Sequence, residues 1–206
     1  MGTVVAPAGS QSPFEAPRPR PFRISVELYD RMADSGVFGD RSPIYLWKGQ
    51  LLEPMPRGLG HSFSLVTLNQ MLIRLVPDGW HARQGSPTRI LDDSEPEPDM
   101  TVVRGSIRDY ASRHPYARDV ALVIEVADSS RTFDLGEKLE GYAVASIPEY
   151  WVVNLREACV EVFTGPTGPS DSPGFERRQV FRAGDEVPIV LNGREVARIA
   201  ADEILP

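Results

Sequence analysis

The sequence predicts an α/β fold in which a mixed β-sheet is flanked by helices. Short apolar runs rich in β-branched residues alternate with segments whose apolar residues recur at helical spacing, and no internal repeat is visible. With 206 residues, 41% of them hydrophobic, the chain can bury one sizeable core. We expect a single domain over residues 22–206. Residues 1–21, rich in Pro, Ala, Gly and Ser, offer little to a core and are expected to form a disordered arm.

The first predicted elements are a helix, a hairpin and a longer helix. Ser25 can cap a helix that Gly36 ends. Residues 44–47 and 50–55 flank Lys48-Gly49 and indicate a hairpin. After a glycine-rich turn at residues 57–60, leucines at three-to-four spacing predict a helix over residues 62–76.

Most of the remaining elements are strands. A second long helix is expected over residues 134–146, and residues 165–174 form a turn-rich insertion with hairpin strands beside it. Residues 184–206 are expected to form short strands and a last turn. The other predicted strands cover residues 80–84, 89–91, 99–103, 120–126, 149–155 and 159–163.

Composition restricts the class of protein. The net charge of -7 argues against a large basic surface for binding DNA phosphates. Acidic residues gathered at a metal site would, however, contribute to this negative net charge. The single cysteine, Cys159, excludes an internal disulfide and lies in a strand-like alternation typical of a buried thiol. No apolar run approaches the roughly 20 residues that span a bilayer, so we expect no membrane partner and a cytoplasmic location.

Three residues are candidates for chemistry. Asp99 heads the apolar run of residues 100–103, and Glu125 follows the apolar run of residues 120–124, where a charge is costly unless it is paired or bound to metal. Lys138 is one of only two lysines against twenty arginines, which favours a need for a compact ammonium. Two carboxylates and a lysine are the minimum for metal-assisted phosphodiester hydrolysis.

Lys138 allows two interpretations. At about 100° per residue it lies near the apolar stripe of its helix, so its stem can cover apolar surface and bring the ammonium to the sheet. Alternatively, Lys138 pairs with Asp134 at i,i+4 on the helix surface, which is worth only a few tenths of a kcal/mol. His61 follows the glycine-rich turn and can contact a metal's outer shell or a phosphate, or can cap the turn. His81 and His114 have no such setting and are expected to be solvated or core residues.

Taken together, these residues resemble the Uma-type family of restriction-endonuclease-like proteins, within the PD-(D/E)XK phosphodiesterase superfamily. The resemblance covers residues 24–206 and depends on the order and spacing of several motifs. These are residues 49–56, His61, residues 97–99, residues 123–126 with 128–130, Asp134 with Lys138 and Tyr142, and residues 147–153.

The resemblance implies roles for individual residues. Asp99 matches the family's first metal-binding aspartate and Glu125 the acid of its second motif. The superfamily usually has a lysine two residues after that acid, where this chain has Ala127, and Lys138 matches a lysine displaced to the next helix. Asp134 and Tyr142 lie one turn to either side of Lys138 and are supporting candidates. The family's Asp-Gly-Glu hairpin is Lys48-Gly49-Gln50 here, with Glu53 nearby, so Gln50 and Glu53 are further supporting candidates.

The implied function is a DNA endonuclease that depends on Mg²⁺ (or Mn²⁺). Asp99 and Glu125 would hold the metal, which lowers the pKa of a bound water, while Lys138 orients that water or helps to deprotonate it. DNA is the expected substrate, and a homodimer is compatible with the sequence. A catalytically degenerate nuclease fold that serves as a binding or interaction module is the alternative, supported by Gln50. A carbohydrate-processing enzyme with two carboxylates fits less well because it gives the lysine no role.

Overall fold

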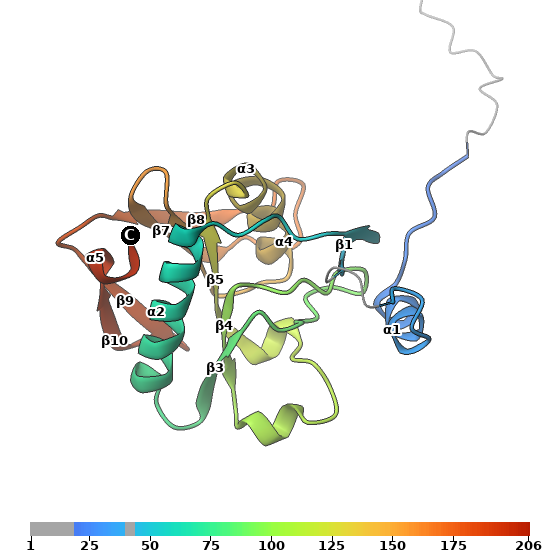
Figure 1. The fold of residues 1–206 in the computed structure, drawn as a ribbon, viewed down its shortest axis with the longest axis horizontal. Helices are drawn as coiled ribbons and strands as arrows, with labels where there is room; N and C mark the ends of the chain where they lie inside the picture. The colour runs from blue at the N-terminus through green and yellow to red at the C-terminus, as the bar shows by residue number, and fades with distance from the viewer. Residues whose placement is uncertain (1–18, 40–43) are drawn as a thin grey trace, which may run out of the picture.

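The computed structural model describes residues 19–39 and 44–206 (Figure 1). The predicted arm therefore lies outside the described residues except for residues 19–21, which are exposed. Helix α1 (Val26–Asp34) begins as expected, because Ser25 Oγ accepts a hydrogen bond from the Leu28 N–H at 3.3 Å. Gly36 follows the end of α1 with a φ of 71°, a left-handed conformation that glycine adopts without strain.

Six strands form the central sheet in the order β3-β4-β5-β6-β7-β8. They are β3 (Trp80–Gln84), β4 (Met100–Arg104), β5 (Val120–Ala127), β6 (Glu149–Asn154), β7 (Cys159–Pro166) and β8 (Phe175–Phe181). Only β5 and β6 pair in parallel; the other neighbours are antiparallel. A parallel pair needs a long crossover connection, and α3 (Arg131–Phe133), η3 (Asp134–Lys138) and α4 (Leu139–Val144) supply it.

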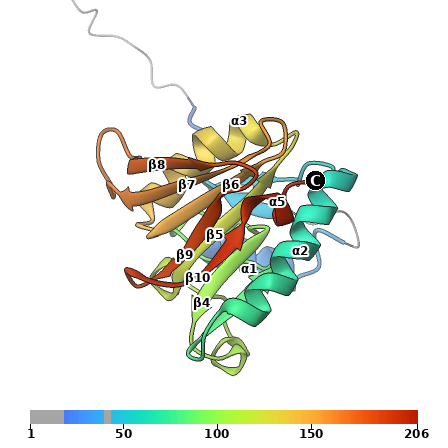
Figure 2. The same cartoon turned by 90° about the vertical axis from the view of Figure 1, so that its left-hand side faces the viewer.

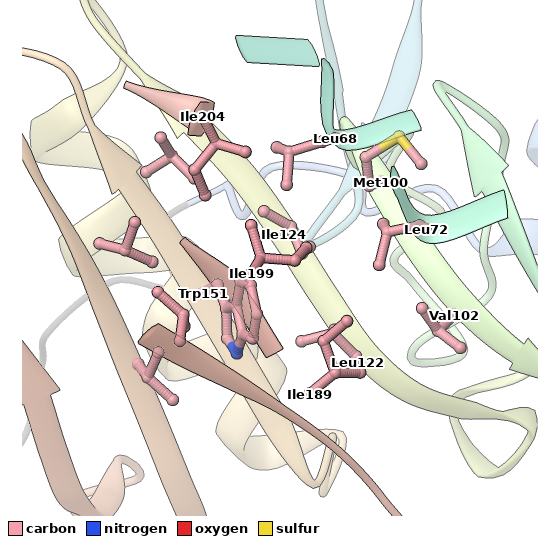
Figure 3. Close-up of a cluster of buried hydrophobic side chains, with 14 of the residues drawn as sticks. Leu68, Leu72, Met100, Val102, Leu122, Ile124, Trp151, Ile189, Ile199 and Ile204 are labelled. Carbon is pink, nitrogen blue, oxygen red and sulfur yellow. The ribbon is translucent and has the colours of Figure 1, made fainter. Parts of the chain in front are cut away.

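One face of the sheet is covered by α2 (Leu59–Leu75) together with a small antiparallel pair of strands and a C-terminal helical turn (Figure 2). The pair consists of β9 (Glu186–Leu191) and β10 (Arg194–Ala200), and the turn is α5 (Ala201–Ile204). Aliphatic side chains and Trp151 fill the core on this face (Figure 3). We call it the apolar face.

The opposite face is covered by the crossover helices and by the hairpin of β1 (Tyr45–Trp47) and β2 (Gln50–Leu52), and its core combines aliphatic side chains with several aromatic rings. The ring of Tyr142 lies 6.0 Å from that of Trp47 and 4.9 Å from that of Tyr150, between centroids. A Cβ added at Gly141 would lie 2.6 Å from the Trp47 ring, so α4 approaches the hairpin this closely only because residue 141 is glycine. We call it the aromatic face.

Several predicted elements need correction. Residues 89–91 form no strand and make only single bridges to Tyr116 and Ser94, because Leu91 and Ser94 bond to each other across a tight turn. Helix α2 begins at Leu59 and takes in the end of the predicted glycine-rich turn. The helix predicted over residues 134–146 begins at Arg131, ends at Val144 and contains a π-helical turn, η3, a feature common at functional sites. A 3₁₀ turn, η1 (Ile107–Tyr110), and a second one, η2 (Ala117–Asp119), connect β4 to β5.

Candidate active site

The pairing of β4 with β5 brings Asp99 and Glu125 together. Met100 lies opposite Ile124 in the antiparallel register, so one further step along both strands sets Asp99 opposite Glu125. Residues directly opposite each other on antiparallel strands point to the same face, with Cβ atoms about 4.5–5.5 Å apart. Two acids distant in the sequence therefore converge at one end of two central strands.

Asp99 is buried and held by three donors. Its Oδ2 atom accepts hydrogen bonds from the Val126 N–H at 2.9 Å and from His61 Nε2 at 3.0 Å, and its Oδ1 atom lies 3.3 Å from an Arg57 nitrogen. Burial alone would raise the pKa of Asp99, but the hydrogen bond and charge of His61 and the Val126 N–H outweigh it and hold the pKa below its ordinary value. Asp99 is therefore ionised at neutral pH.

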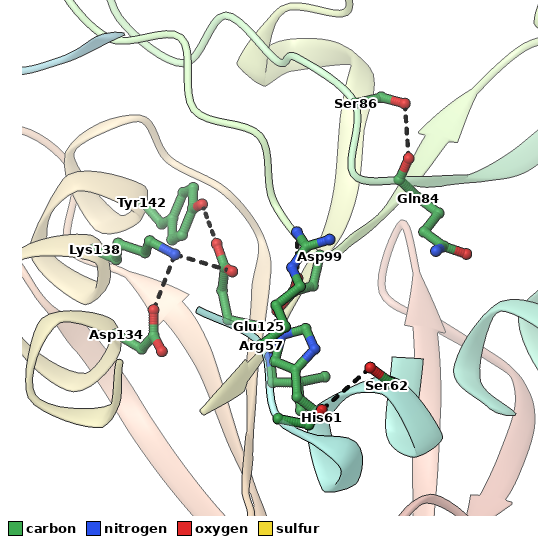
Figure 4. A network of polar contacts seen from close by, with 12 residues as sticks. Arg57, His61, Ser62, Gln84, Ser86, Asp99, Glu125, Asp134, Lys138 and Tyr142 are labelled. Atoms are coloured by element: carbon green, nitrogen blue, oxygen red, sulfur yellow. Dashed lines mark hydrogen bonds and ion pairs between the residues drawn. The ribbon is translucent and has the colours of Figure 1, made fainter. Parts of the chain in front are cut away.

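Glu125 is also buried, but its pKa moves the other way. Its Oε1 atom accepts a hydrogen bond from the Tyr142 O–H at 2.8 Å, and its Oε2 atom lies 3.0 Å from Lys138 Nζ (Figure 4). Burial raises the pKa of Glu125 to about 7, against the opposing charge of Lys138 and with further upward pressure from Asp99. The two carboxyls thus differ in their affinity for a proton.

Lys138 bridges two carboxylates. Its Nζ atom lies 3.0 Å from Glu125 Oε2 and 3.0 Å from Asp134 Oδ1, so the ammonium lies between two carboxyl groups (Figure 4). Burial lowers the pKa of Lys138, but Glu125 and Asp134 outweigh it and raise the pKa well above the ordinary value. The i,i+4 pair with Asp134 exists, but it is not on the helix surface, since only 12% of the Lys138 side chain is exposed.

The position two residues after Glu125 contributes no charge. Ala127 is fully buried on the aromatic face, on the same side of β5 as Glu125. The ammonium near Glu125 comes instead from η3, in the crossover that follows β5.

A cavity of about 380 Å³ opens where these groups meet. Its walls include Asp99, Glu125, Lys138 and His61. Asp134 and Tyr142 are not among the residues that line it. Asp134 contacts Lys138 and Tyr142 contacts Glu125, so both support residues that do line the cavity.

The other sequence candidates lie elsewhere. Gln50 and Glu53 are exposed and are not among the residues that line the cavity within the described part of the chain. His81 is partly buried, with Nδ1 2.8 Å from the Gly105 carbonyl oxygen, and neither it nor His114 lines the cavity. Of the three histidines, His61 alone lies at the cavity, 7% exposed in the first turn of α2.

Two residues at the cavity mouth, Arg57 and Glu97, were not predicted from the sequence as site residues. Arg57 lines the cavity and contacts Asp99, although it belongs to no regular element. Glu97 also lines it, and burial raises the pKa of Glu97 against the charge of Arg57. The sequence signal that could have indicated them is their closeness to predicted site residues: Glu97 precedes Asp99 by two residues, and Arg57 precedes His61 by four.

The side chains alone do not enclose a metal ion. Over residues 19–39 and 44–206, no three His, Cys, Asp or Glu side chains are grouped so that they could hold one. Asp99 and Glu125 could provide two hard carboxylate ligands, and any remaining ligands would have to be backbone, water or substrate atoms.

A mixed sheet flanked by helices, with two acids at the ends of neighbouring strands, defines a restriction-endonuclease-like α/β protein. The chain belongs to the Uma2 family, described as "Putative restriction endonuclease", whose model matches residues 26–198. The family and the fold support a nuclease, and restriction-endonuclease-like proteins generally use divalent metals.

A solved structure has the same fold. It is the crystal structure of a "putative nuclease belonging to DUF820" from Anabaena variabilis ATCC 29413, with a TM-score of 0.64 and 14% sequence identity. The match covers 88% of this chain and 97% of that chain. A comparison with curated proteins found no match. None of the helices in the described residues has the length and apolar character needed to cross a membrane.

Proposed function

We propose that this protein is a Mg²⁺- or Mn²⁺-dependent DNA endonuclease with Asp99, Glu125 and Lys138 as its catalytic residues. The observation that carries the proposal is the convergence of these three side chains on one cavity, with Lys138 Nζ 3.0 Å from Glu125 Oε2. A buried cluster of this kind costs desolvation free energy that a purely apolar core avoids, which favours a functional reason for it.

The donor set is compatible with Mg²⁺. This ion is usually bound through one or two carboxylates, with waters and substrate phosphate oxygens completing an octahedron. Asp99 and Glu125 would be the two carboxylate ligands, each already oriented by a hydrogen bond, from Val126 and Tyr142 respectively. When bound, the metal would acidify a water and stabilise negative charge on the phosphate.

Lys138 acts in this proposal as a donor and not as a base. Its raised pKa keeps the ammonium protonated, and an ammonium carries three N–H donors. The ion pairs with Glu125 and Asp134 hold the ammonium at the cavity wall, where one N–H would orient the attacking water. Asp134 and Tyr142 would hold Lys138 and Glu125 in position, and His61 would hold Asp99.

The competing proposal is a binding or interaction module that keeps the fold without cleaving DNA. It is favoured by Gln50, which replaces the hairpin glutamate of the family, and by the net charge of -7. Fold alone does not decide between the two, because related folds host unrelated functions.

Single-turnover cleavage of a supercoiled plasmid in Mg²⁺ tests the proposal. Asp99→Asn and Lys138→Arg should each reduce the cleavage rate by about a hundredfold or more, on the scale of positioned acid-base groups. Lys138→Arg keeps the charge, but a planar guanidinium cannot place one donor where a compact ammonium does. Melting curves should stay near those of the wild type.

The chain offers matched controls. Lys48→Arg changes the other lysine, which is more exposed and pairs with Glu140 at 3.8 Å, and Asp78→Asn changes an exposed aspartate; both should cleave normally. Full activity in Lys138→Arg would remove the lysine from the mechanism. A wild type that binds DNA but never cleaves it would establish the binding module instead.

A further inference from the structure

Arg57 contacts Asp99 at the cavity, which both residues line. Its guanidinium nitrogen lies 3.3 Å from Asp99 Oδ1, and 47% of its side chain is exposed. Its charge also acts on Glu97, so the guanidinium lies near two acids at the cavity mouth. Within residues 19–39 and 44–206, Asp99 is the one carboxylate with which Arg57 forms an ion pair.

The two oxygens of Asp99 are not equally available. Oδ2 already accepts two hydrogen bonds, from the Val126 N–H and from His61, which fills its two lone pairs. Among the described residues, Oδ1 has only the longer contact, with Arg57 at 3.3 Å. A cation bound by Asp99 would therefore use Oδ1, and the nearby positive charge of Arg57 would oppose it.

The contact between Arg57 and Asp99 is easily broken. It is a single contact of 3.3 Å, and the Arg57 side chain lies on an irregular segment and is half-exposed, so water can solvate the guanidinium once it leaves Asp99. A freed guanidinium at the cavity mouth can pair with phosphate oxygens through two parallel hydrogen bonds. Helix α2 begins two residues later, so the positive end of its dipole adds to the positive charge of Arg57.

We propose that Arg57 is a substrate-binding residue that exchanges partners: it pairs with Asp99 in the metal-free protein and with a DNA phosphate once a divalent cation is bound. This inference rests on the proposed function, since it assumes metal at Asp99 and DNA in the cavity. It assigns to Arg57 two opposite effects, one that weakens metal binding and one that strengthens DNA binding.

The test compares Arg57→Gln with Arg74→Gln. Arg74 is an exposed arginine in the last turn of the same 17-residue helix, about 22 Å from its N-terminus at 1.5 Å per residue, and serves as the matched control. Mn²⁺ affinity is measured by calorimetry without DNA. The affinity for a short DNA duplex is measured by fluorescence anisotropy in Ca²⁺ at several salt concentrations.

Arg57→Gln should bind Mn²⁺ about threefold to tenfold more tightly than the wild type, because one cation near Asp99 is gone. It should bind DNA roughly tenfold more weakly, with a salt dependence reduced by about one phosphate contact. Arg74→Gln should match the wild type in Mn²⁺ affinity.

Unchanged Mn²⁺ affinity or unchanged DNA affinity in Arg57→Gln would overturn the exchange, even if the wild type cleaves DNA. A wild type that binds no Mn²⁺ at all would overturn the exchange and the proposed function together. The two failures are therefore distinguishable.

Discussion

The two faces of the central sheet are buried equally well but with different chemistry. On the apolar face, α2, β9, β10 and α5 cover aliphatic side chains and Trp151. On the aromatic face, the crossover helices cover tyrosine, tryptophan and phenylalanine rings, and the buried charges of Glu125, Asp134 and Lys138 lie among them. The contrast is sharpest in β5, where Ile124 and Glu125 are adjacent, both buried, and point to opposite faces.

The difference indicates that one face of the sheet mainly stabilises the fold, while the other carries the charged residues of the candidate site. A fully buried aliphatic side chain stabilises the fold by about 1.5–3 kcal/mol, whereas buried ion pairs regain at best part of their desolvation cost. The burial free energy of the apolar face therefore offsets the desolvation cost of the charged cluster on the aromatic face. Because side chains alternate along a strand, one central strand can serve both purposes.

The largest effect should follow from a cavity in the apolar face. Leu68 is fully buried in α2, and Leu68→Ala should lower the free energy of unfolding of the protein by about 2–5 kcal/mol. Leu59→Ala, in the same helix but 94% exposed, should change it by less than about 0.5 kcal/mol. Urea denaturation measures both. If Leu68→Ala also abolished Mn²⁺ binding at a temperature where it is folded, the two faces would not be separable.

A second prediction concerns Glu149, a buried carboxyl on the apolar face. Its Oε1 atom accepts a hydrogen bond from Trp151 Nε1 at 2.5 Å, and no cation pairs with it among the described residues. Burial raises the pKa of Glu149 from 4.5 to about 7. Between these two pH values the folded chain binds the extra proton, so this group makes the protein less stable as the pH rises from about 4.5 to 7.

Glu149→Gln keeps an acceptor for Trp151 and removes the titration. At pH 8 the variant should be more stable than the wild type by up to about 3 kcal/mol, and near pH 4 the two should be equal. Urea denaturation from pH 4 to pH 8 measures the difference, and Mn²⁺ affinity should not change because Glu149 lies away from the cavity. An equal pH dependence in both proteins would contradict the raised pKa.

The elements that were predictable from sequence are those with long, regular patterns. The leucines of α2 and the apolar run of β5 have unambiguous periods, and both elements are present. Residues 89–91 were predicted as a strand from three residues, too few to distinguish a strand from a turn that bonds to itself. The π turn of η3 was not predictable, because no local pattern encodes one extra residue in a helix.

The site was only partly predictable for a similar reason. Asp99 and Glu125 were recognisable as charges beside apolar runs, but the register of β4 and β5 that sets them opposite each other is a tertiary property. The depth of Lys138 depends on how η3 packs on the sheet. Arg57 was missed because an exposed arginine in an irregular segment has no periodic signal.

The smallest effect is expected at the hairpin, where the resemblance to the family implies a glutamate at residue 50. Gln50 is exposed in β2, pairs with Trp47 across the hairpin and is not among the residues that line the cavity. Gln50→Glu introduces the glutamate that the resemblance implies, yet it should change Mn²⁺ affinity by less than about twofold, because an exposed charge outside the cavity is screened by solvent. Calorimetry in 0.15 M salt measures this, with Gln70→Glu, an exposed glutamine on α2, as the control for added charge. Mn²⁺ binding tenfold tighter in Gln50→Glu than in Gln70→Glu would extend the site to the hairpin. The metal ligands would then come from the hairpin that covers the aromatic face as well as from the sheet.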